Sequence, residues 1–295
     1  FPLEGHDKAI LAAQAAEAAG RQKAEYFYAL KDRFYALRDE WVNLTQEEFL
    51  TWLYTQIEDM GLDEERFVND MEDEAILNKI LTLQAEGLSV GIPGTPFILI
   101  DGDPYQGPRD YISLEMVVNL LQLQYLQYTT CPPEVIDPQK QYQAIIEMEE
   151  GDIVIQLLPE KAPLAVNNFV FLARNGWYDN SPFFRVIHGY YAQTGDPSGT
   201  GYGGPGFTYV NEIDPTLIFD QPGVVAMSNF GSPNSNGSQF LITYAALPEL
   251  NGLYTIFGYV VEGMDILENL EERNPAAGGD QKPASRIITV RIEEK

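Results

Sequence analysis

Hydrophobic residues recur at spacings of three and four through most of residues 1–126, which predicts amphipathic helices. An alanine-rich stretch at 9–19 leads into a second one whose apolar face consists of Tyr26, Leu30, Phe34 and Leu37. Further helices are expected over 45–57, 63–67, 73–86 and 111–123. In GTPFILIDG, residues 94–102, a Thr-Pro turn precedes a continuous apolar run, which predicts a short buried strand. The first part should therefore be a mainly helical α/β domain.

Polar residues mark where three of these helices should begin. Thr45 and Glu48 stand in the order of a capping box, in which each side chain binds the backbone N–H of the other. Asp63 occupies the corresponding first position of the next helix, where a side-chain oxygen accepts a free backbone N–H, and the helix after that should begin at Asp73.

The pattern changes after residue 126. Residues 127–141, QYTTCPPEVIDPQKQ, hold three prolines and no periodicity, which is typical of an extended linker. Beyond it, short runs such as YQAIIEME, GDIVIQLL and RIITVRIEE predict strands, with one amphipathic helix at 163–176. Many short strands at close spacing indicate a closed antiparallel barrel in which the last strand pairs with the first. We divide the chain into domains 1–126 and 142–295, joined by linker 127–141.

Composition limits the classes of function. The chain has 295 residues, of which 45% are hydrophobic, enough for two cores. Its 44 acidic and 18 basic residues give a net charge of -26, which repels nucleic acid and anionic lipid alike. No apolar run approaches the roughly 18 residues of a membrane-spanning helix. We therefore expect no nucleic-acid partner and no membrane span.

Thiol and metal chemistry are limited as well. Cys131 is the single cysteine, so an internal disulfide or a CxxC pair is excluded. With His6 and His188 it cannot supply a typical zinc set, and we expect neither a metal nor a cofactor. The chain begins at Phe1 instead of methionine, which we interpret as a processed form of something longer.

Two motif matches lack the structural context that their chemistry needs. GLSVG, residues 87–91, fits the G-x-S-x-G nucleophile elbow, but a helix precedes it and a strand follows, the reverse of the required order. GYGGPG, residues 201–206, fits G-x-G-x-x-G, yet no helix follows whose N-terminus would hold a pyrophosphate. We interpret both as turns.

Arg185 is the one lysine or arginine between Arg174 and Arg273, and apolar residues flank it on both sides. Such an isolated guanidinium indicates a specific hydrogen-bonding role and not a solvated surface. Three segments near it closely resemble the cyclophilin-type peptidyl-prolyl isomerases: FFRVIHGYYAQTGDPSGTGYGGPG (183–206), NSNGSQFLIT (234–243) and YTIFGYVVEGMDIL (254–267). The resemblance covers about residues 142–295 and implies that this part isomerises X-Pro bonds of polypeptides.

The resemblance also assigns a role to the arginine. Delocalisation of the nitrogen lone pair gives an amide a rotation barrier of about 18–20 kcal/mol. A guanidinium directed at the prolyl nitrogen stabilises the twisted state over the planar one. The implied catalytic residues are Arg185, Gln193, Asn229 and Tyr254, the last at a position commonly held by histidine. No nucleophile, general base or metal is needed.

A second set of residues is implied to bind the substrate: Tyr190, Tyr191, Ser228, Phe230, Gln239, Leu241 and Leu250. Tyr190 and Tyr191 replace a usual phenylalanine and methionine, Leu241 replaces a phenylalanine, and Glu249 stands where tryptophan is frequent. These changes should reshape the proline pocket. As alternatives, Asn229 and Gln239 could simply satisfy backbone groups, and Tyr190 and Leu250 could be ordinary core residues.

The front part resembles the C-terminal portion of DsbA-like thioredoxin domains, in FPL (1–3), the helices that follow and GIPGTPFILIDG (91–102). The resemblance implies a structural cis-proline at Pro96 and places the reactive cysteines upstream of Phe1. Without the first strand and the cysteine-bearing helix, this part should not catalyse thiol exchange, since Cys131 has no partner. We expect an N-terminal segment or a neighbouring copy to complete the exposed sheet.

Together these features predict an extracytoplasmic protein-folding factor or chaperone that acts on proline-containing polypeptides. A different class is open: a non-catalytic peptide-binding, structural or assembly protein that uses the barrel groove and the incomplete sheet as interaction surfaces. The pocket changes favour the second interpretation, whereas the retained Arg185, Gln193, Asn229 and Gln239 favour the enzyme.

Overall fold

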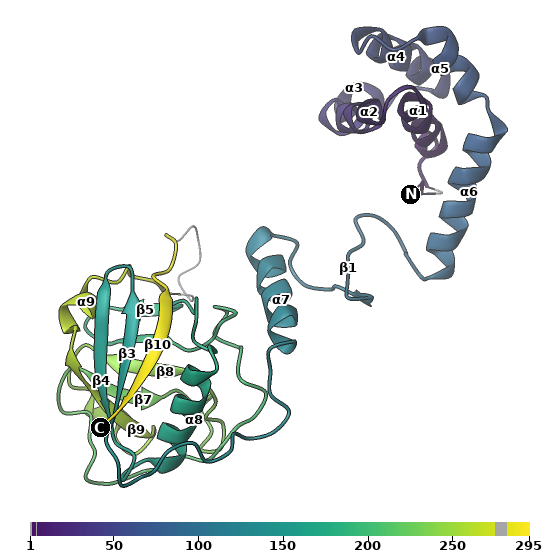
Figure 1. The fold of residues 1–295 in the computed structure, drawn as a ribbon. Coiled ribbons are helices and arrows are strands. Elements are labelled where there is room, and N and C mark those ends of the chain that lie inside the picture. The colour runs from purple at the N-terminus through teal and green to yellow at the C-terminus, as the bar shows by residue number, and fades with distance from the viewer. Residues whose placement is uncertain (1, 4, 275–281) are drawn as a thin grey trace. The chain divides into compact units, whose positions relative to one another are not determined.

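A computed structural model describes residues 2–3, 5–274 and 282–295 of the chain (Figure 1). The chain forms two compact units, one ending at Gln106 and the other beginning at Gly107. Helix α7 (Tyr111–Gln124), which the hydrophobic pattern grouped with the first domain, is thus part of the second unit. In the described part of the chain, no helix has both the length and the hydropathy to cross a bilayer.

Six helices build the first unit in its described residues: α1 (Ala9–Gln22), α2 (Ala24–Ala36), α3 (Arg38–Trp41), α4 (Gln46–Asp59), α5 (Glu64–Met71) and α6 (Glu74–Ser89). The predicted capping box is confirmed, because Glu48 N donates to Thr45 Oγ1 over 3.3 Å and Thr45 N donates to the Glu48 carboxylate over 2.8 Å. Asp63 accepts a backbone N–H group at the start of α5, as predicted, and Asp73 does the same at the start of α6. Helix α5 continues beyond the expected end at residue 67.

The core of the first unit is aromatic at its centre. The rings of Phe34, Trp41, Phe49 and Trp52 lie with centroids 5.4–6.2 Å apart. Burying each large apolar side chain contributes about 1.5–3 kcal/mol, so this group stabilises the packing of α2, α3 and α4. The helical stripe that the sequence predicted therefore faces this core.

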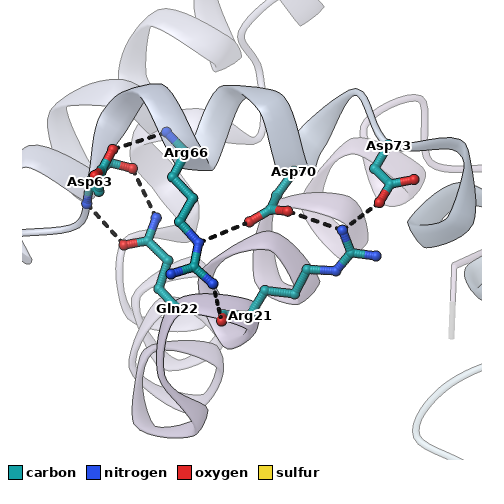
Figure 2. Close-up of polar contacts among 6 residues, drawn as sticks. All are labelled: Arg21, Gln22, Asp63, Arg66, Asp70 and Asp73. Atoms are coloured by element: carbon teal, nitrogen blue, oxygen red, sulfur yellow. Dashed lines mark hydrogen bonds and ion pairs between the residues drawn. The ribbon is translucent and has the colours of Figure 1, made fainter.

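A polar cluster joins the end of α1 to α5 and α6, as Figure 2 shows. The Arg21 guanidinium donates to Asp70 over 3.0 Å and also to Asp73. Beside it, Gln22 and Asp63 exchange two hydrogen bonds of 2.8 and 2.9 Å. The hydrogen bond from Arg21 lowers the pKa of the Asp73 carboxyl. These groups are exposed or half-buried, so they fix the relative positions of the helices more than they stabilise the unit.

The prediction of a buried strand within 94–102 is wrong. Strands β1 (Leu99–Ile100) and β2 (Asp103–Pro104) form a two-residue hairpin, and Leu99 is 50% exposed. Asp101 and Gly102 both have positive φ, of 52° and 89°, as a tight Asp-Gly hairpin turn requires. The apolar run therefore folds back on itself after two residues. The Thr95–Pro96 peptide bond is cis, the isomer that the resemblance implied.

The second unit contains one eight-stranded antiparallel sheet, with the order β10-β3-β4-β9-β7-β8-β6-β5. Its strands are β3 (Tyr142–Met148), β4 (Gly151–Leu157), β5 (Arg185–Ile187), β6 (Tyr191–Thr194), β7 (Val224–Met227), β8 (Phe240–Thr243), β9 (Ile256–Glu262) and β10 (Ile287–Glu294). The last strand pairs with the first, as predicted, with Val290 opposite Ile146. Figure 1 shows β4, β3 and β10 side by side.

The sheet curls strongly, but the prediction of a fully closed barrel is wrong. Strands β10 and β5 end the sheet on opposite sides, and no ladder joins them in the described residues. An isolated bridge between Pro182 and Arg286, with a hydrogen bond of 2.9 Å from Phe183 N to Ser285 O, spans the gap instead. On the outer edge of β5, Val186 exchanges two backbone hydrogen bonds of 2.8 and 2.9 Å with Arg273, so these groups are not available to β10.

Besides α7, the described residues of the second unit form three further helical segments: α8 (Pro163–Arg174), the 3₁₀ turn η1 (Pro248–Leu250) and α9 (Met264–Glu268). Phe169 of α8 packs against Tyr178, Phe240 and Phe257, with centroids 5.0–5.4 Å away. The Glu212 carboxylate accepts the N–H groups of Leu164 and Ala165 in the first turn of α8, over 3.0 and 2.8 Å. Burial raises the pKa of Glu212, while these hydrogen bonds oppose the rise.

Residues 127–141 contain no helix or strand, in agreement with the extended segment expected there, but they pack closely on the second unit. The Tyr128 ring lies 5.2 Å from Phe171 and 6.4 Å from Phe207. Val135 N donates to Asn167 Oδ1 over 2.7 Å, and Ile136 is buried. This segment is therefore part of the surface of the second unit.

Candidate active site

Arg185 and Gln193 lie opposite each other on the neighbouring strands β5 and β6. Arg185 Nη1 donates to Gln193 Oε1 over 3.1 Å and to the Tyr191 hydroxyl over 3.2 Å. Both acceptors are neutral, so they orient the guanidinium without cancelling its charge. The side chain is half-buried, which leaves part of the fork free for a further acceptor.

Gln193 in turn is held by two further side chains. Its Nε2 donates to Gln239 Oε1 and to Ser228 Oγ, each over 2.9 Å. Gln239 Nε2 donates to the carbonyl oxygens of Gly201 and Gly203, over 3.0 and 2.9 Å. Gln193 and Gln239 are both buried, and a buried amide with every group paired has one stable orientation. Arg185 is therefore positioned by a fixed chain of glutamines.

Asp196 organises the loop from which those carbonyls project, and sequence analysis did not identify it. The carboxylate is fully buried and accepts the N–H groups of Ser198, Gly201 and Gly203 over 2.9, 2.7 and 3.0 Å. It also accepts the hydroxyls of Ser198 and Thr200. One acid within a run of small residues was the available signal, because such runs can wrap their N–H groups around an anion.

An apolar cluster lies beside the guanidinium. Leu241 and Leu250 are buried in one cluster with Phe219 and Ile256, and the partly buried Tyr190, Tyr191 and Tyr254 pack against it. The rings of Tyr190 and Tyr191 have centroids 4.6 Å apart. The Tyr191 hydroxyl, bound to Arg185, connects this cluster to the polar chain. The structure thus brings most of the predicted site residues together.

The phenols of Tyr190 and Tyr254 remain protonated near neutral pH. Burial raises the pKa of Tyr254 above its ordinary value of 10.0, with a further rise from Tyr191 and an opposing effect of Arg185. Burial likewise raises the pKa of Tyr190. Each hydroxyl is therefore a hydrogen-bond donor, and Tyr254 can donate to a carbonyl oxygen where a histidine would otherwise stand.

The loop after β7 carries the remaining predicted residues. Asn229 Nδ2 donates to Leu253 O over 3.0 Å, and its Oδ1 accepts Gly231 N over 3.0 Å, so this side chain is engaged with backbone and not with Arg185. Phe230 is 58% exposed. A hollow of about 290 Å³ lies between this loop and the glycine-rich loop, lined by Ser228, Phe230, Tyr202 and Gln239 among others. An extended peptide next to Arg185 would meet uncharged groups there.

Comparisons with known proteins find similarity in both parts of the chain. A family model described as cyclophilin type peptidyl-prolyl cis-trans isomerase/CLD matches residues 144–294, and a thioredoxin family model matches residues 1–119. Peptidyl-prolyl cis-trans isomerase 9 of Schizosaccharomyces pombe is 46% identical over 152 residues, which are 50% of this chain and 25% of that protein. Peptidyl-prolyl cis-trans isomerase CYP18-1 of Arabidopsis thaliana is 41% identical over 145 residues, 48% of this chain and 89% of that protein.

A solved cyclophilin type peptidyl-prolyl cis-trans isomerase of Cryptosporidium parvum has 36% sequence identity and a TM-score of 0.48, covering 52% of this chain and 98% of its own. The chain spans about a quarter of the length of the fission-yeast relative. The matched region holds Arg185, Gln193 and Gln239 together with the apolar cluster. By the extent of the family match and the coverage of the Arabidopsis relative, the chain belongs to the cyclophilin-type peptidyl-prolyl cis-trans isomerase family.

Proposed function

We propose that residues 142–295 catalyse cis–trans isomerisation of X-Pro bonds in polypeptides. The observation that carries this proposal is the placement of Arg185, held by Gln193 and Tyr191 at 3.1 and 3.2 Å, at the edge of the Leu241–Leu250 apolar cluster. That arrangement suits a proline ring packed against the cluster, with its imide nitrogen near the guanidinium. Membership of the isomerase family supports the same reaction.

The reaction makes and breaks no covalent bond, so catalysis consists of stabilising the twisted amide. When the X-Pro bond rotates, the nitrogen lone pair is no longer delocalised and becomes a hydrogen-bond acceptor. The Arg185 N–H groups can then donate to it, an interaction that the planar ground state lacks. Tyr254, kept protonated by its raised pKa, can donate to the carbonyl oxygen of the preceding residue.

An isomerisation assay on a proline-containing peptide tests this proposal. Arg185→Ala should lower kcat/KM roughly 10²–10³-fold, the usual effect of removing one preorganised donor to developing charge. Arg174→Ala is the matched control, because this arginine of α8 donates to Val135 O, away from the proposed site. Equal rates for wild type and Arg185→Ala would contradict the enzymatic proposal.

A second candidate is a protein that binds proline-containing segments without isomerising them. The replacement of aromatic pocket residues supports it, since Leu241 and Tyr190 stand where the family usually has phenylalanine. Peptide binding measured by calorimetry, together with a rate equal to the uncatalysed one in wild type, would favour this candidate. Acceleration by wild type would exclude it.

For the first unit we propose a DsbA-like thioredoxin domain whose sheet is completed by another segment of the protein or by a neighbouring copy. The thioredoxin match to residues 1–119 supports the fold, and the exposed apolar residues Leu88, Val90 and Leu99 support the need for a covering strand. Light scattering and mass spectrometry on the chain test it. A chain that stays monomeric at every concentration, with β1–β2 backbone amides that exchange freely with solvent, would contradict it.

We also propose that the protein acts outside the cytoplasm as a folding factor or chaperone for proline-containing clients. The pairing of a thioredoxin-like region with an isomerase domain in one chain supports this placement. Cell fractionation with an antibody against the chain tests it. Recovery in the cytoplasmic fraction alone would contradict it.

A further inference from the structure

We propose that Leu123 of helix α7 is a positioning residue of the isomerase site and acts through the glycine-rich loop 198–206. The inference rests on the proposed isomerase function. It concerns a part of the chain outside residues 144–294, the range that matches the isomerase family. Helix α7 would thereby add to the site a support that the matched domain does not itself contain.

Leu123 is the one buried residue of α7, with 3% of its surface exposed, and it packs into the core of the second unit. It lies directly against Gly203. A Cβ atom at Gly203 would be only 2.6 Å from Leu123 Cδ2 and 2.0 Å from Asp196 Oδ1. The leucine and the buried carboxylate thus fill the space that a side chain at Gly203 would need, and both lie against its backbone.

Three hydrogen bonds from the same segment hold the loop alongside Leu123. Asn119 Nδ2 donates to Ser198 O over 3.3 Å, and Gln127 Nε2 donates to Gly204 O over 2.9 Å. Tyr128 N donates to Pro205 O over 2.8 Å. The segment 119–128 therefore contacts the loop at both ends and in the middle, while Asp196 binds it from within.

The loop connects this segment to the guanidinium through three consecutive hydrogen bonds. Gly203 O accepts Gln239 Nε2 over 2.9 Å, and Gln239 Oε1 accepts Gln193 Nε2 over 2.9 Å. Gln193 Oε1 then accepts Arg185 Nη1 over 3.1 Å. Catalytic groups must be held to within about 0.5 Å, so a shift of Gly203 passed along this chain would misplace the guanidinium.

Leu123→Ala tests the inference in the full chain. We expect kcat to fall about three- to tenfold while the KM for the peptide changes less than about twofold, the range of couplings transmitted through packed contacts. Leu123→Met, which fills the same space, should restore kcat. Val118→Ala is the matched control, because Val118 lies on α7 with 42% of its surface exposed.

A double-mutant cycle separates positioning from a general loss of stability. If Leu123 acts through Gln239, then Leu123→Ala should have no further effect on kcat in a Gln239→Ala background. Additive losses in the two variants would overturn the inference. So would a kcat for Leu123→Ala equal to that of wild type.

Hydrogen exchange gives a readout that needs no enzymatic activity. In Leu123→Ala the amides of Gly201 and Gly203, which donate to Asp196, should exchange faster, while those of β3 and β10 should not change. Unchanged exchange at both glycines would overturn the inference. A wild type no faster than Arg185→Ala would instead refute the proposed function, and the exchange data would still decide whether Leu123 holds the loop.

Discussion

Gln193 accepts a hydrogen bond from Arg185 on the adjacent strand and donates to Gln239 on the other side, so one buried amide fixes both the site's cation and the loop that supports it. The pairing of β5 with β6 places Arg185 opposite Gln193. The pairing of β6 with β8 places Gln193 opposite Leu241 of the apolar cluster. The sheet register therefore sets the distance between the guanidinium and the pocket before any substrate arrives.

Gln193→Ala should lower kcat/KM by about 10- to 100-fold, since a hydrogen bond to a charged group is worth about 1.5–3 kcal/mol. The guanidinium would keep its contact with Tyr191 but lose its fixed orientation. The peptide isomerisation assay measures the change, and Gln143→Ala on β3 is the control. A variant as fast as wild type would show that Tyr191 alone suffices to hold Arg185.

The pH profile of isomerisation should be flat on the alkaline side up to about pH 10, the ordinary value for a tyrosine. Burial raises the pKa of Tyr254, so its hydroxyl keeps its proton throughout that range. Tyr254→Phe should lower the rate at every pH without introducing a titration. Tyr254→His should introduce a titration near the ordinary histidine pKa of about 6.5. A wild-type profile that declines near neutrality would contradict the assigned role.

Glu212→Ala should destabilise the second unit by about 0.5–2 kcal/mol, the usual cost of losing a helix cap. Its carboxylate binds two N–H groups in the first turn of α8, a helix whose own first residues supply no side-chain cap. Denaturant unfolding followed by the fluorescence of Trp177 measures the loss. Glu160→Ala, an exposed acid just before the helix, should leave the midpoint unchanged.

Acid should weaken the attachment of the loop at residues 214–217. Hydrogen bonds from Lys161 and Thr216 hold the pKa of Asp214 at about 2. Because this pKa lies below that of an unfolded aspartate, about 3.9, the stabilisation is complete above pH 4 or so and is lost as the pH falls towards 2.

Lys161→Ala removes the main cause of that shift, so an NMR titration should find the pKa of Asp214 raised in the variant. The melting temperature of the variant should also depend less on pH between about 4 and 2. An unchanged titration of Asp214 in Lys161→Ala would assign the shift to Thr216.

Features fixed by neighbouring residues were predictable from the sequence. The Thr45–Glu48 capping box and the Asp63 cap depend on residues three positions apart, and both are present. The clustering of Arg185, Gln193 and Gln239 followed from the family resemblance and not from their spacing. The hairpin at 99–104 was missed because the Asp-Gly turn signal received less weight than the apolar run.

Features that depend on distant parts of the chain were not predictable. Glu212 caps a helix 47 residues before it, and nothing in the local pattern indicates that contact. Helix α7 is apolar on nearly every side, so its sequence could not tell which surface covers it. Asp196 was indistinguishable from 43 other acidic residues until the loop around it was folded.

The buried Asp196 carboxylate is bound by uncharged groups. In the described chain its hydrogen-bond donors are peptide N–H groups and hydroxyls, with no lysine or arginine among them. Dipoles that are covalently part of the same loop are not displaced by dissolved ions, unlike a surface ion pair. The loop that supports the isomerase site should therefore keep its conformation at low and at high salt concentration.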